Sequence, residues 1–563
     1  MFKEIWVVDF EFRGEDGDRP EPVCMVAWEL VSRRRVFLWQ GEFPAAPPYS
    51  TGPDSLFIAF SSPAEFSCTL ELGWPRPQNV LDLYVEFRCR SNGVTPPEDI
   101  NLLAVCRRFR IQTITDKEKE YWQALVLRGG PWSLEQREGI LHYCETDVVI
   151  TAELYEQMLP EIDLERALLR GRYMHAVARM VRVGVPVDVP LWKRLSDRWE
   201  PIKQLLIADI DSAYGVYVNG SFSTQKFTEY LWREGIAWPR LESGELDLAD
   251  DTFERMSDIF PKLRPLRYLR SALSKLRLSS FTLGRDGFNR AWLAPFWTIT
   301  GRNQPSPSKF IFGASSWLRG LVKAPPGYGL CYIDWVQQEY GTAAALSGDP
   351  AKIKAYNSTD SYLWLAKEIG AVPPDATKET HELEREIYKQ CTLGTQYEMQ
   401  AASLAVRIGK SKAYAKQLLQ ADREIFHVYW EWLDTARLNC FMAAEQSTVF
   451  GWRKRITSRC DNPRAVGNFF SQANGGEMMR LAAIFATEAR IQVCAPVHDA
   501  FLIMAPLELL DAHTGQMRRY MEKASEIVLD GFCLRTEEHP FPYPKRYSCK
   551  KGEAMWNKVM ALL

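Results

Sequence analysis

The chain has 563 residues, of which 46% are hydrophobic and 25% are charged, and its formal net charge is −2 at pH 7. This length predicts two to four domains, and the balanced charge excludes a histone-like protein that binds nucleic acid through its overall charge. Twelve cysteines without a C-x-x-C pair argue against a zinc ribbon or a disulfide framework. Because no apolar run approaches the roughly 20 residues of a membrane span, we expect a cytoplasmic protein that does not bind a membrane.

The first 165 residues are predicted to form an α/β domain. Apolar patterning and turn residues place strands at 4–12, 23–31 and 35–39, and helices at 97–109 and 133–159. The last two strands continue the first in a hairpin-like manner.

Several acidic residues of this region are spaced for metal binding. Asp9 and Glu11 lie two apart on a strand and therefore share a face. Tyr143 and Asp147 lie four apart on a helix and also share a face. Four acids and a tyrosine can hold two metal ions and orient a water molecule for phosphodiester hydrolysis. A single D-x-E pattern is common, however, and most often has only a structural role.

The region 166–290 is predicted to be mostly helical, with a long amphipathic helix at 164–183. The stretch 262–290 holds eight basic residues, one acidic residue and three interleaved aromatic residues. A charge run is usually a solvated helix face, but its single sign and its aromatics favour contact with a phosphate backbone. Arg270 and Lys275 are its candidate DNA contacts.

Residues 321–563 alternate apolar strands with long helices. A strand at 329–335 carries Asp334 near its end, and the apolar run 495–504 carries Asp499 in its middle. If these segments are neighbours in one sheet, the two carboxylates can hold two divalent metal ions. Either acid alone favours the alternative of a helix cap or a turn residue.

A helix between these two acids carries Arg385, Lys389, Leu393 and Tyr397 at intervals of four residues, so they lie along one face. The two cations suit a triphosphate, and the aromatic ring suits a base or a sugar. The alternative is a surface stripe of salt bridges beside the edge of a core.

These segments together resemble the motifs of family-A DNA polymerases, the bacterial DNA polymerase I type. The segment 334–349 resembles the first palm motif, 385–397 the fingers-helix motif, and 497–499 the last palm motif. The segment 300–302 resembles the thumb-to-palm motif, and 464–472 resembles the helix that reads the minor groove. Five motifs in the family's order make the resemblance specific.

The resemblance implies a DNA polymerase that adds deoxynucleotides to primer-template DNA with two Mg²⁺ ions, or Mn²⁺ in their place. Asp334 and Asp499 would be the metal ligands. Lys389 would bind the triphosphate and protonate the leaving pyrophosphate, and Glu339 would exclude a 2′-hydroxyl by its bulk. The other implied nucleotide contacts are Gln337, Arg385, Leu393 and Tyr397, and the implied DNA contacts are Arg302, Arg464, Asn468, Gln472 and His498.

The chain departs from the family's pattern at three positions. Ala500 stands where the family usually has Glu, Leu393 replaces an aromatic residue, and Glu398 replaces a glycine. Ala500 and Leu393 favour the alternative of a 3′–5′ exonuclease whose polymerase domain is impaired and only binds DNA.

The N-terminal residues resemble the 3′–5′ proofreading exonuclease of the same family. Asp9, Glu11, Tyr143 and Asp147 match its first and last motifs, and either Glu65 or Asp82 supplies its middle acid. Asp9, Glu11, Glu65 and Asp147 would hold the metal ions. A degenerate domain with only a structural role is the alternative.

The resemblance also implies the domain layout of an α/β multidomain protein. A ribonuclease-H-like exonuclease domain would span 1–165, a helical thumb and connecting region 166–320, and a palm 321–563, with fingers inserted at about 350–460. This compact layout is similar to that of phage polymerases. It implies a monomer that replicates phage or mobile-element DNA in the host cytoplasm, with replication accessory proteins as further partners.

Overall fold

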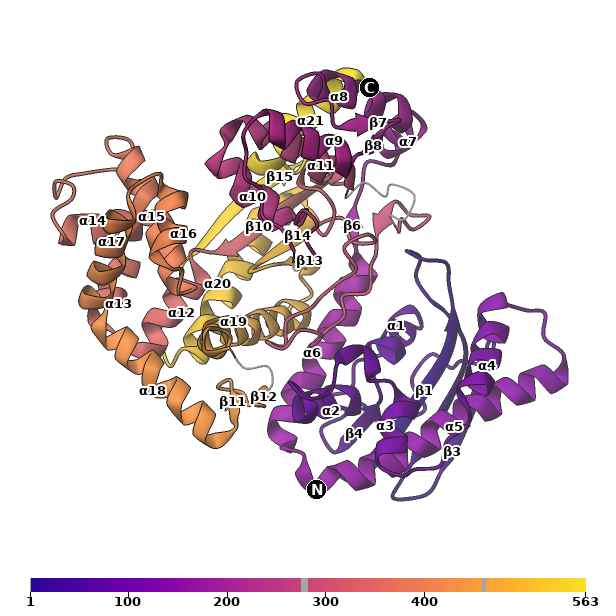
Figure 1. The fold of residues 1–563 in the computed structure, drawn as a ribbon. Coiled ribbons are helices and arrows are strands. Elements are labelled where there is room, and N and C mark those ends of the chain that lie inside the picture. Colours follow the sequence, from indigo (N-terminus) through magenta and orange to yellow (C-terminus); the bar gives the residue numbers. More distant parts are fainter. Residues whose placement is uncertain (1, 242, 275–281, 458–461) are drawn as a thin grey trace.

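The computed structural model describes residues 2–241, 243–274, 282–457 and 462–563 (Figure 1). An N-terminal sheet domain lies to one side of a central sheet, and two helical arms rise from that central part (Figure 1). The candidate DNA contact Lys275 lies outside the described residues. Within those residues, no helix combines the length and hydropathy that crossing a bilayer requires.

The N-terminal domain is built on a five-stranded mixed sheet with the order β3-β2-β1-β4-β5. The strands β1, β2 and β3 pair antiparallel, whereas β4 and β5 continue the sheet parallel to β1. Their bounds are Glu4–Arg13, Glu21–Glu29, Arg35–Trp39, Ser55–Ala59 and Asn79–Asp82. The three strands predicted from the sequence are confirmed, and β4 and β5 extend the sheet beyond them.

Five helices accompany this sheet, and α5 packs directly on β1 and β2. The predicted helix at 133–159 is confirmed as α5, which Ser133 caps through its side chain. The predicted helix at 97–109 is wrong in its first turn, because Asn101 caps a separate and shorter helix there. The helices are α1 (Pro63–Glu71), α2 (Leu83–Ser91), α3 (Leu102–Arg108), α4 (Asp116–Arg128) and α5 (Leu134–Met158).

Helix α6 (Leu164–Val183) joins the N-terminal domain to the rest of the molecule, as predicted for this segment. It packs on β5 and α1 at one side and on β13 and α19 at the other. A Cβ atom at Gly171 would lie 2.0 Å from the carbonyl oxygen of Val80, so this close approach to β5 requires glycine. The helix ends at Gly184, whose φ of 70° is readily adopted by glycine.

One helical arm follows α6 and has a small aromatic core of its own around Phe227, Trp238 and Phe253. The C-terminal helix α21 (Lys550–Leu562) packs against its helix α8. The arm contains α7 (Val189–Asp197), α8 (Trp199–Asp211), β7 (Tyr217–Val218), β8 (Ser221–Phe222), α9 (Thr224–Arg233), α10 (Asp250–Ile259) and α11 (Arg264–Ser274), and β6 (Val185–Pro186) pairs with β9 (Phe288–Asn289) at its base.

The central sheet has four antiparallel strands in the order β13-β14-β10-β15. The apolar run 495–504 divides between β13 and β14, and His498 and Asp499 form the two-residue turn that joins them. Strand β15 contains two prolines, which an edge strand tolerates. The strands are β10 (Tyr328–Trp335), β13 (Gln492–Val497), β14 (Ala500–Pro506) and β15 (Thr536–Pro542).

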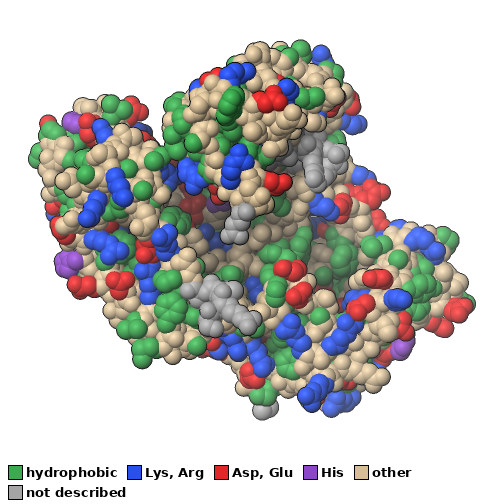
Figure 2. Space-filling view, in the orientation of Figure 1, with side chains coloured by type: hydrophobic (Ala, Val, Ile, Leu, Met, Phe, Trp, Pro, Cys, Tyr) green, Lys and Arg blue, Asp and Glu red, His purple; other side chains and the backbone are tan. Residues whose placement is uncertain are grey.

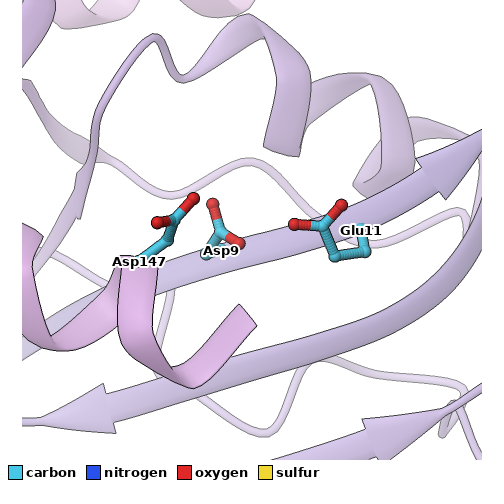
Figure 3. Close-up of side chains that lie close together, drawn as sticks. All are labelled: Asp9, Glu11 and Asp147. Carbon is cyan, nitrogen blue, oxygen red and sulfur yellow. The ribbon is translucent and has the colours of Figure 1, made fainter. Parts of the chain in front are cut away.

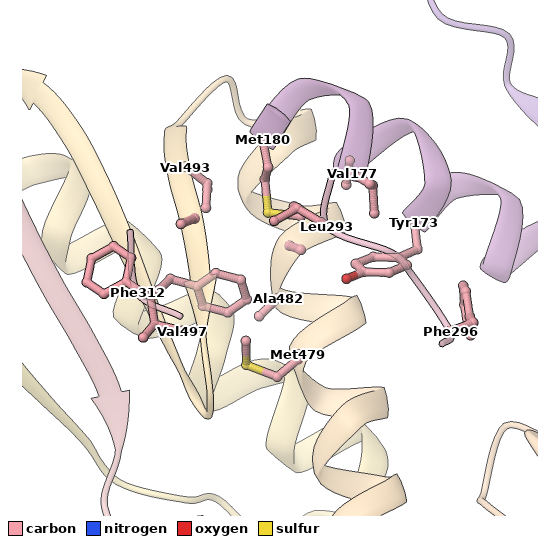
Figure 4. Packing of buried hydrophobic residues seen from close by; sticks show 14 of the residues in the cluster. Tyr173, Val177, Met180, Leu293, Phe296, Phe312, Met479, Ala482, Val493 and Val497 are labelled. Atoms are coloured by element: carbon pink, nitrogen blue, oxygen red, sulfur yellow. The ribbon is translucent and has the colours of Figure 1, made fainter. Parts of the chain in front are cut away.

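Two long helices cover this sheet. Helix α20 (Leu510–Val528) packs on β10, β14 and β15, and α19 (Pro463–Glu488) packs on α20, β13 and α6. Side chains of α6, α19 and β13 meet in one buried cluster, with Phe296 and Phe312 from the intervening loops (Figure 4). The central sheet and α6 therefore share a hydrophobic core.

The second helical arm is inserted between β10 and α19. Its helices pack in chain order, so that each contacts the next or the next but one. They are α12 (Gln338–Ser347), α13 (Pro350–Asn357), α14 (Ser361–Glu368), α15 (Glu382–Gln396), α16 (Ala401–Ile408), α17 (Lys412–Ile425) and α18 (His427–Ala443), followed by the hairpin of β11 (Glu445–Ser447) and β12 (Arg453–Arg455).

Candidate active sites

The N-terminal domain brings three carboxylates together. Asp9 and Glu11 rise from the same side of β1, and Asp147 on α5 lies beside Asp9 (Figure 3). Their ligand oxygens lie within 4.8 Å of one another. The Cys144 thiol donates a hydrogen bond of 3.2 Å to the Asp9 carboxylate. Asp9 and Glu11, two residues apart on β1, and Asp147 on α5 thus come together, as their spacing in the sequence indicated.

Burial makes this cluster costly to ionise. Burial and the charge of Asp147 raise the pKa of Asp9 to about 7. The pKa of Glu11 is raised well above its usual value, first by burial and then by the charge of Asp9. One oxygen of Asp147 is buried and has no hydrogen-bond partner among the described residues. Oxygen donors with excess negative charge suit a hard divalent cation such as Mg²⁺.

The two candidates for the middle acid have different surroundings. Asp82 caps α2 through Val85 and accepts three further hydrogen bonds, from the backbone amides of Ser61 and Ser62 and the Ser62 hydroxyl. Glu65 on α1 is 3% exposed, and its Oε2 atom is without a partner in the described part of the chain. Burial raises its pKa, and the Asp9 charge raises it further. Glu65 thus has an oxygen available for a ligand, whereas Asp82 is occupied as a helix cap.

Lys119 is a member of this site that the sequence did not indicate. Its ammonium donates a hydrogen bond of 2.7 Å to Asp147 Oδ2 and lies 5.7 Å from the centre of the Tyr143 ring. The segment around it, Asp116-Lys-Glu-Lys-Glu, has the composition of a solvated helix face, so no local signal marks one of its lysines as buried. Tyr143 is itself buried beside these acids. Burial is the main cause of its raised pKa, and the negative charges of the neighbouring acids raise the pKa further.

A second pair of carboxylates meets at the end of the central sheet. Asp334 is opposite Ala500 in the pairing of β10 with β14, and the Trp335 amide donates a 3.4 Å hydrogen bond to the Asp499 carbonyl oxygen. The acids are therefore adjacent, one at a strand end and one in the turn. Burial and the charge of Asp499 raise the pKa of Asp334 to about 6. Asp334 Oδ1 is buried and lacks a partner in the described ranges.

The neighbouring strand adds a carboxylate that the sequence did not predict. Glu537 on β15 is directly opposite Asp334 on the other side of β10. Cross-strand partners share one face of a sheet, so Glu537 and Ala500 flank Asp334 from the two sides. The prolines of β15 obscured this strand in the sequence.

A chain of polar contacts connects the sheet end to the surrounding helices. The Tyr397 hydroxyl donates to Glu339 at 2.5 Å, and the Arg302 guanidinium lies 3.8 Å from the same carboxylate. Arg302 also donates to the Gln472 carbonyl oxygen at 3.0 Å. The end of α15, the start of α12, the 300–302 loop and α19 therefore meet at one place.

The predicted cationic stripe lies on α15, and Tyr397 is the residue that ends this helix. Arg385 is paired with Asp360. Lys389 is paired with Glu386 at 3.1 Å, and Leu393 is 36% exposed. Gln337 precedes α12 with a φ of 52° and accepts a 2.6 Å hydrogen bond from the hydroxyl of Ser361 on α14.

A cavity of about 990 Å³, lined by more basic than acidic side chains, lies between the first helical arm, the segment 307–319 and the start of α21. His498 lines this cavity. Burial and the charge of Arg319 lower the pKa of its imidazole from 6.5, so the ring is mainly neutral at pH 7. The guanidinium of Arg270 stacks 4.2 Å from the Phe253 ring centre. This face of the molecule is hollowed between the two arms and the N-terminal domain, with lysines and arginines at the edges (Figure 2). Residues that line the cavity include Arg264, Arg267, Arg270, Arg319, His498 and Lys551.

The cations that the structure describes in the stretch 262–290 do not form one continuous surface for a phosphate backbone. Four of its cations are neutralised within the protein, and two of these pairs turn away from the cavity because Arg285 and Arg290 contact the loop at 17–18. The pairs are Lys262–Glu234, Arg267–Glu254, Arg285–Asp18 and Arg290–Asp286.

The remaining candidate DNA contacts lie along α19. Arg464, Asn468 and Gln472 are four residues apart and share one face of the helix. Arg464 is exposed near its start, and the other two are half-buried.

Comparison with known proteins matches part of the C-terminal half of this chain to a family. Residues 313–533 match the family model described as DNA polymerase family A. The chain contains a family A DNA polymerase domain. The matched residues include both palm acids, α15 and α19, whereas Arg302, Glu537 and the N-terminal acids lie outside them.

Relatives of the polymerase domain are known from phages and bacteria. The chain is 24% identical over 410 residues to the DNA polymerase of Mycobacterium phage L5, covering 69% of this chain and 65% of that protein. It is 23% identical over 440 residues to DNA polymerase I of Chloroflexus aurantiacus, covering 71% and 46%. The chain thus spans about half to two thirds of the length of these relatives.

The fold is similar to that of a solved polymerase. The POL domain of Pol1 from M. smegmatis, solved in a complex with DNA primer-template and dNTP, has a TM-score of 0.75 to this chain. The match covers 95% of each chain at 16% sequence identity. The similarity therefore concerns the fold of nearly the whole chain, including the parts that flank the polymerase domain.

One departure from the family pattern has a structural counterpart in the polymerase domain. Glu398 has a left-handed φ of 52°, which glycine adopts most readily. Its carboxylate is paired with Arg437 of α18, a side chain that is 10% exposed. The ion pair thus ties the segment that follows α15 to α18.

Proposed function

We propose that this protein is a DNA-templated DNA polymerase that adds deoxynucleotides to a primer 3′ end, with 3′–5′ exonuclease proofreading. The observation that carries the proposal is the meeting of Asp334 and Asp499 at the end of the central sheet, within a family A polymerase domain. Arg385 and Lys389 of α15 lie within the same matched segment as these two acids, although they are far from them in sequence. On this proposal the first helical arm is the thumb, the central sheet the palm and the second arm the fingers.

In the palm, Asp334 and Asp499 would hold the divalent metal ions. Mg²⁺ at such a site lowers the pKa of an attacking hydroxyl and neutralises the charge of the leaving phosphate. The unpartnered Oδ1 atom of Asp334 fits this role. The residues implied by the family resemblance, together with Glu537, thus supply the oxygen donors that hard cations prefer.

On the fingers, Arg385 and Lys389 would exchange their present carboxylate partners for the oxygens of the incoming triphosphate. Lys389 then stands ready to donate a proton to the leaving pyrophosphate. The contact between Glu339 and Tyr397 narrows the space in which the sugar would lie and excludes a 2′-hydroxyl. Leu393, which lies between Lys389 and Tyr397 along α15, would contact the base of the nucleotide with its aliphatic side chain.

DNA would lie across the hollow of Figure 2, with its duplex beside the thumb cavity and α19. Arg464, Asn468 and Gln472 would donate hydrogen bonds to minor-groove acceptors that every base pair presents. Neutral His498 would contact the primer end. Recognition of this kind senses the shape of a base pair and not its sequence.

In the N-terminal domain, Asp9, Glu11, Glu65 and Asp147 would hold two metal ions, and Tyr143 would orient the attacking water. We assign the middle acid to Glu65 and a structural role to Asp82, because only Glu65 has an unoccupied oxygen. The sheet order β3-β2-β1-β4-β5, with the acids on the central strand, supports the predicted ribonuclease-H-like exonuclease.

Similarity to phage polymerases supports a role in replicating phage or mobile-element DNA. We propose that the protein does so as a monomer in the cytoplasm of a host. Ala500 next to Asp334 supports a second candidate, an exonuclease whose polymerase domain binds DNA without synthesis. Extension of a labelled primer distinguishes the two.

The test uses the full chain with Mg²⁺ and a primer on a longer template, with and without the four deoxynucleotides. We expect extension with nucleotides and shortening from the 3′ end without them. Asp499→Asn should abolish extension and keep shortening, whereas Asp9→Asn should do the reverse. Shortening of the primer under both conditions by the unmodified chain would establish the second candidate instead.

A further inference from the structure

Lys119 is held against the N-terminal carboxylates by the packing of its helix. Thr115 and Glu118 form a capping box that fixes the start of α4 one turn before Lys119. Trp122, on the next turn, packs so closely on α5 that a Cβ at Gly139 would lie 2.2 Å from its ring. The helix therefore cannot slide relative to the helix that carries Asp147.

Lys119 is the inward-facing residue of a charged run. Its side chain is 22% exposed and that of Asp147 is 6% exposed, whereas Lys117, Glu118 and Glu120 are exposed. The ion pair between Lys119 Nζ and Asp147 Oδ2 is thus largely shielded from solvent, where charge-assisted hydrogen bonds are strong.

The carboxylate cluster still has oxygen atoms to spare for a ligand. Asp147 is 4% exposed, and its Oδ1 atom has no hydrogen-bond partner in the described part of the chain, nor does Glu65 Oε2. These buried oxygens, which face the site, indicate a cation that the ammonium does not replace. With Lys119 paired to Asp147, the carboxyl groups of Asp9 and Glu11 remain beside this pair as further oxygen donors.

We propose that Lys119 is a positioning residue of the N-terminal site, which holds Asp147 when no metal ion is bound and competes with a divalent cation for its Oδ2 atom. This inference rests on the proposed exonuclease function. Metal binding then requires the ammonium to leave Asp147. It remains next to the ring of Tyr143, where the anionic phosphodiester of a bound strand is its next partner.

The competition predicts that removal of the ammonium strengthens metal binding. A charged hydrogen bond of roughly 1.5–3 kcal/mol that must be broken on binding corresponds to a loss of affinity of about tenfold or more. Lys119→Met should therefore bind Mn²⁺ about tenfold more tightly than the unmodified site. Lys119→Arg keeps the charge and should stay within about twofold.

Mn²⁺ binding is measured by electron paramagnetic resonance on the full chain that also carries Asp334→Asn and Asp499→Asn, so that the palm does not contribute. Lys117→Met, on the exposed side of the same helix, is the matched control and should leave the affinity unchanged. In EDTA, Lys119→Met should lower the melting temperature of the N-terminal domain, and Mn²⁺ should restore it. This stability readout applies even if the variant folds poorly without metal.

Equal or weaker Mn²⁺ binding by Lys119→Met would overturn the proposal, as would an equal gain from Lys117→Met. The proposed exonuclease fails separately, if the chain with intact Lys119 and intact acids does not shorten a single strand in Mg²⁺. The two failures are therefore distinguishable, because one is read from metal affinity and the other from DNA cleavage.

Discussion

Replacing Asp9 with asparagine is expected to stabilise the N-terminal domain in the absence of metal, by an amount that grows with pH. Burial and the charge of Asp147 raise the pKa of Asp9 from 3.8 to about 7. Below pH 4 the carboxyl group is protonated in both the folded and the unfolded chain. As the pH rises toward 7, the unfolded chain releases this proton first, so the favourable contribution of protonated Asp9 to folding is progressively lost.

The displacement of this pKa sets the size of the effect. At 1.36 kcal/mol for each pKa unit, the rise from 3.8 to about 7 costs the folded domain at most about 4 kcal/mol of unfolding free energy at pH 8. Asparagine has a similar shape and no charge to bury, so Asp9→Asn removes this cost. The melting temperature of the domain should rise by several degrees or more at pH 8 and by progressively less toward pH 4.

The measurement is thermal unfolding of the full chain in EDTA between pH 4 and pH 8. Mg²⁺ should reduce the difference between the two proteins, because the ion stabilises the chain that retains its carboxylate. The reasoning is refuted if Asp9→Asn and the unmodified chain melt together at pH 8, or if their difference grows as the pH falls.

Asp82 provides a matched control in the same domain. Burial also raises its pKa, to about 6, but its oxygens accept four hydrogen bonds from the protein. An asparagine at this position would turn its amide group toward at least one backbone donor, which costs roughly 1–3 kcal/mol. Asp82→Asn should therefore lower the melting temperature at pH 8, opposite in sign to Asp9→Asn.

Three further predictions concern the polymerase domain. Glu339→Ala should raise the ratio of kcat/KM for ribonucleotides over deoxynucleotides by about tenfold or more, and an unchanged ratio contradicts the steric role. Glu398→Gly should lower stability by about 2 kcal/mol in thermal unfolding despite the favourable φ, because the mostly buried Arg437 loses its nearer carboxylate and keeps only Asp434, at 3.6 Å. Arg464→Ala should weaken primer-template binding, measured by fluorescence anisotropy, equally for all duplex sequences, and a loss confined to some sequences argues against minor-groove recognition.

The sequence predicted those parts of the sites that depend on local periodicity. Asp9 and Glu11 share a face because strands repeat every two residues, and Arg385 and Lys389 share one because four residues are about one helical turn. The helix that begins after Ser133 was predictable for the same reason, since a capping residue precedes an apolar repeat.

The parts that escaped prediction depend on contacts between distant segments. Glu537 joins the palm only through the pairing of β15 with β10, and the prolines of β15 hide that strand from local patterns. Lys119 cannot be told from Lys117 without the packing of α4 on α5. Four described cations of 262–290 are neutralised by acids such as Asp18, which lies more than 240 residues away in sequence.

The contacts of α15 indicate how the fingers could move without a large energetic cost. Arg385, Lys389 and Tyr397 are each held by a carboxylate, at Asp360, Glu386 and Glu339. Partly exposed ion pairs of this kind contribute only about 0–1 kcal/mol each. A triphosphate offers the two cations oxygens of higher charge, so its binding exchanges one set of charged hydrogen bonds for a stronger one.

The Tyr397–Glu339 contact differs from the two ion pairs, because Glu339 also lies beside Arg302, which is bonded to α19. Movement of α15 is therefore felt at the helix that would read the DNA minor groove. On the proposed function, this arrangement would link nucleotide binding at α15 to the fit of the primer-template at α19 through the side chains of Tyr397, Glu339 and Arg302.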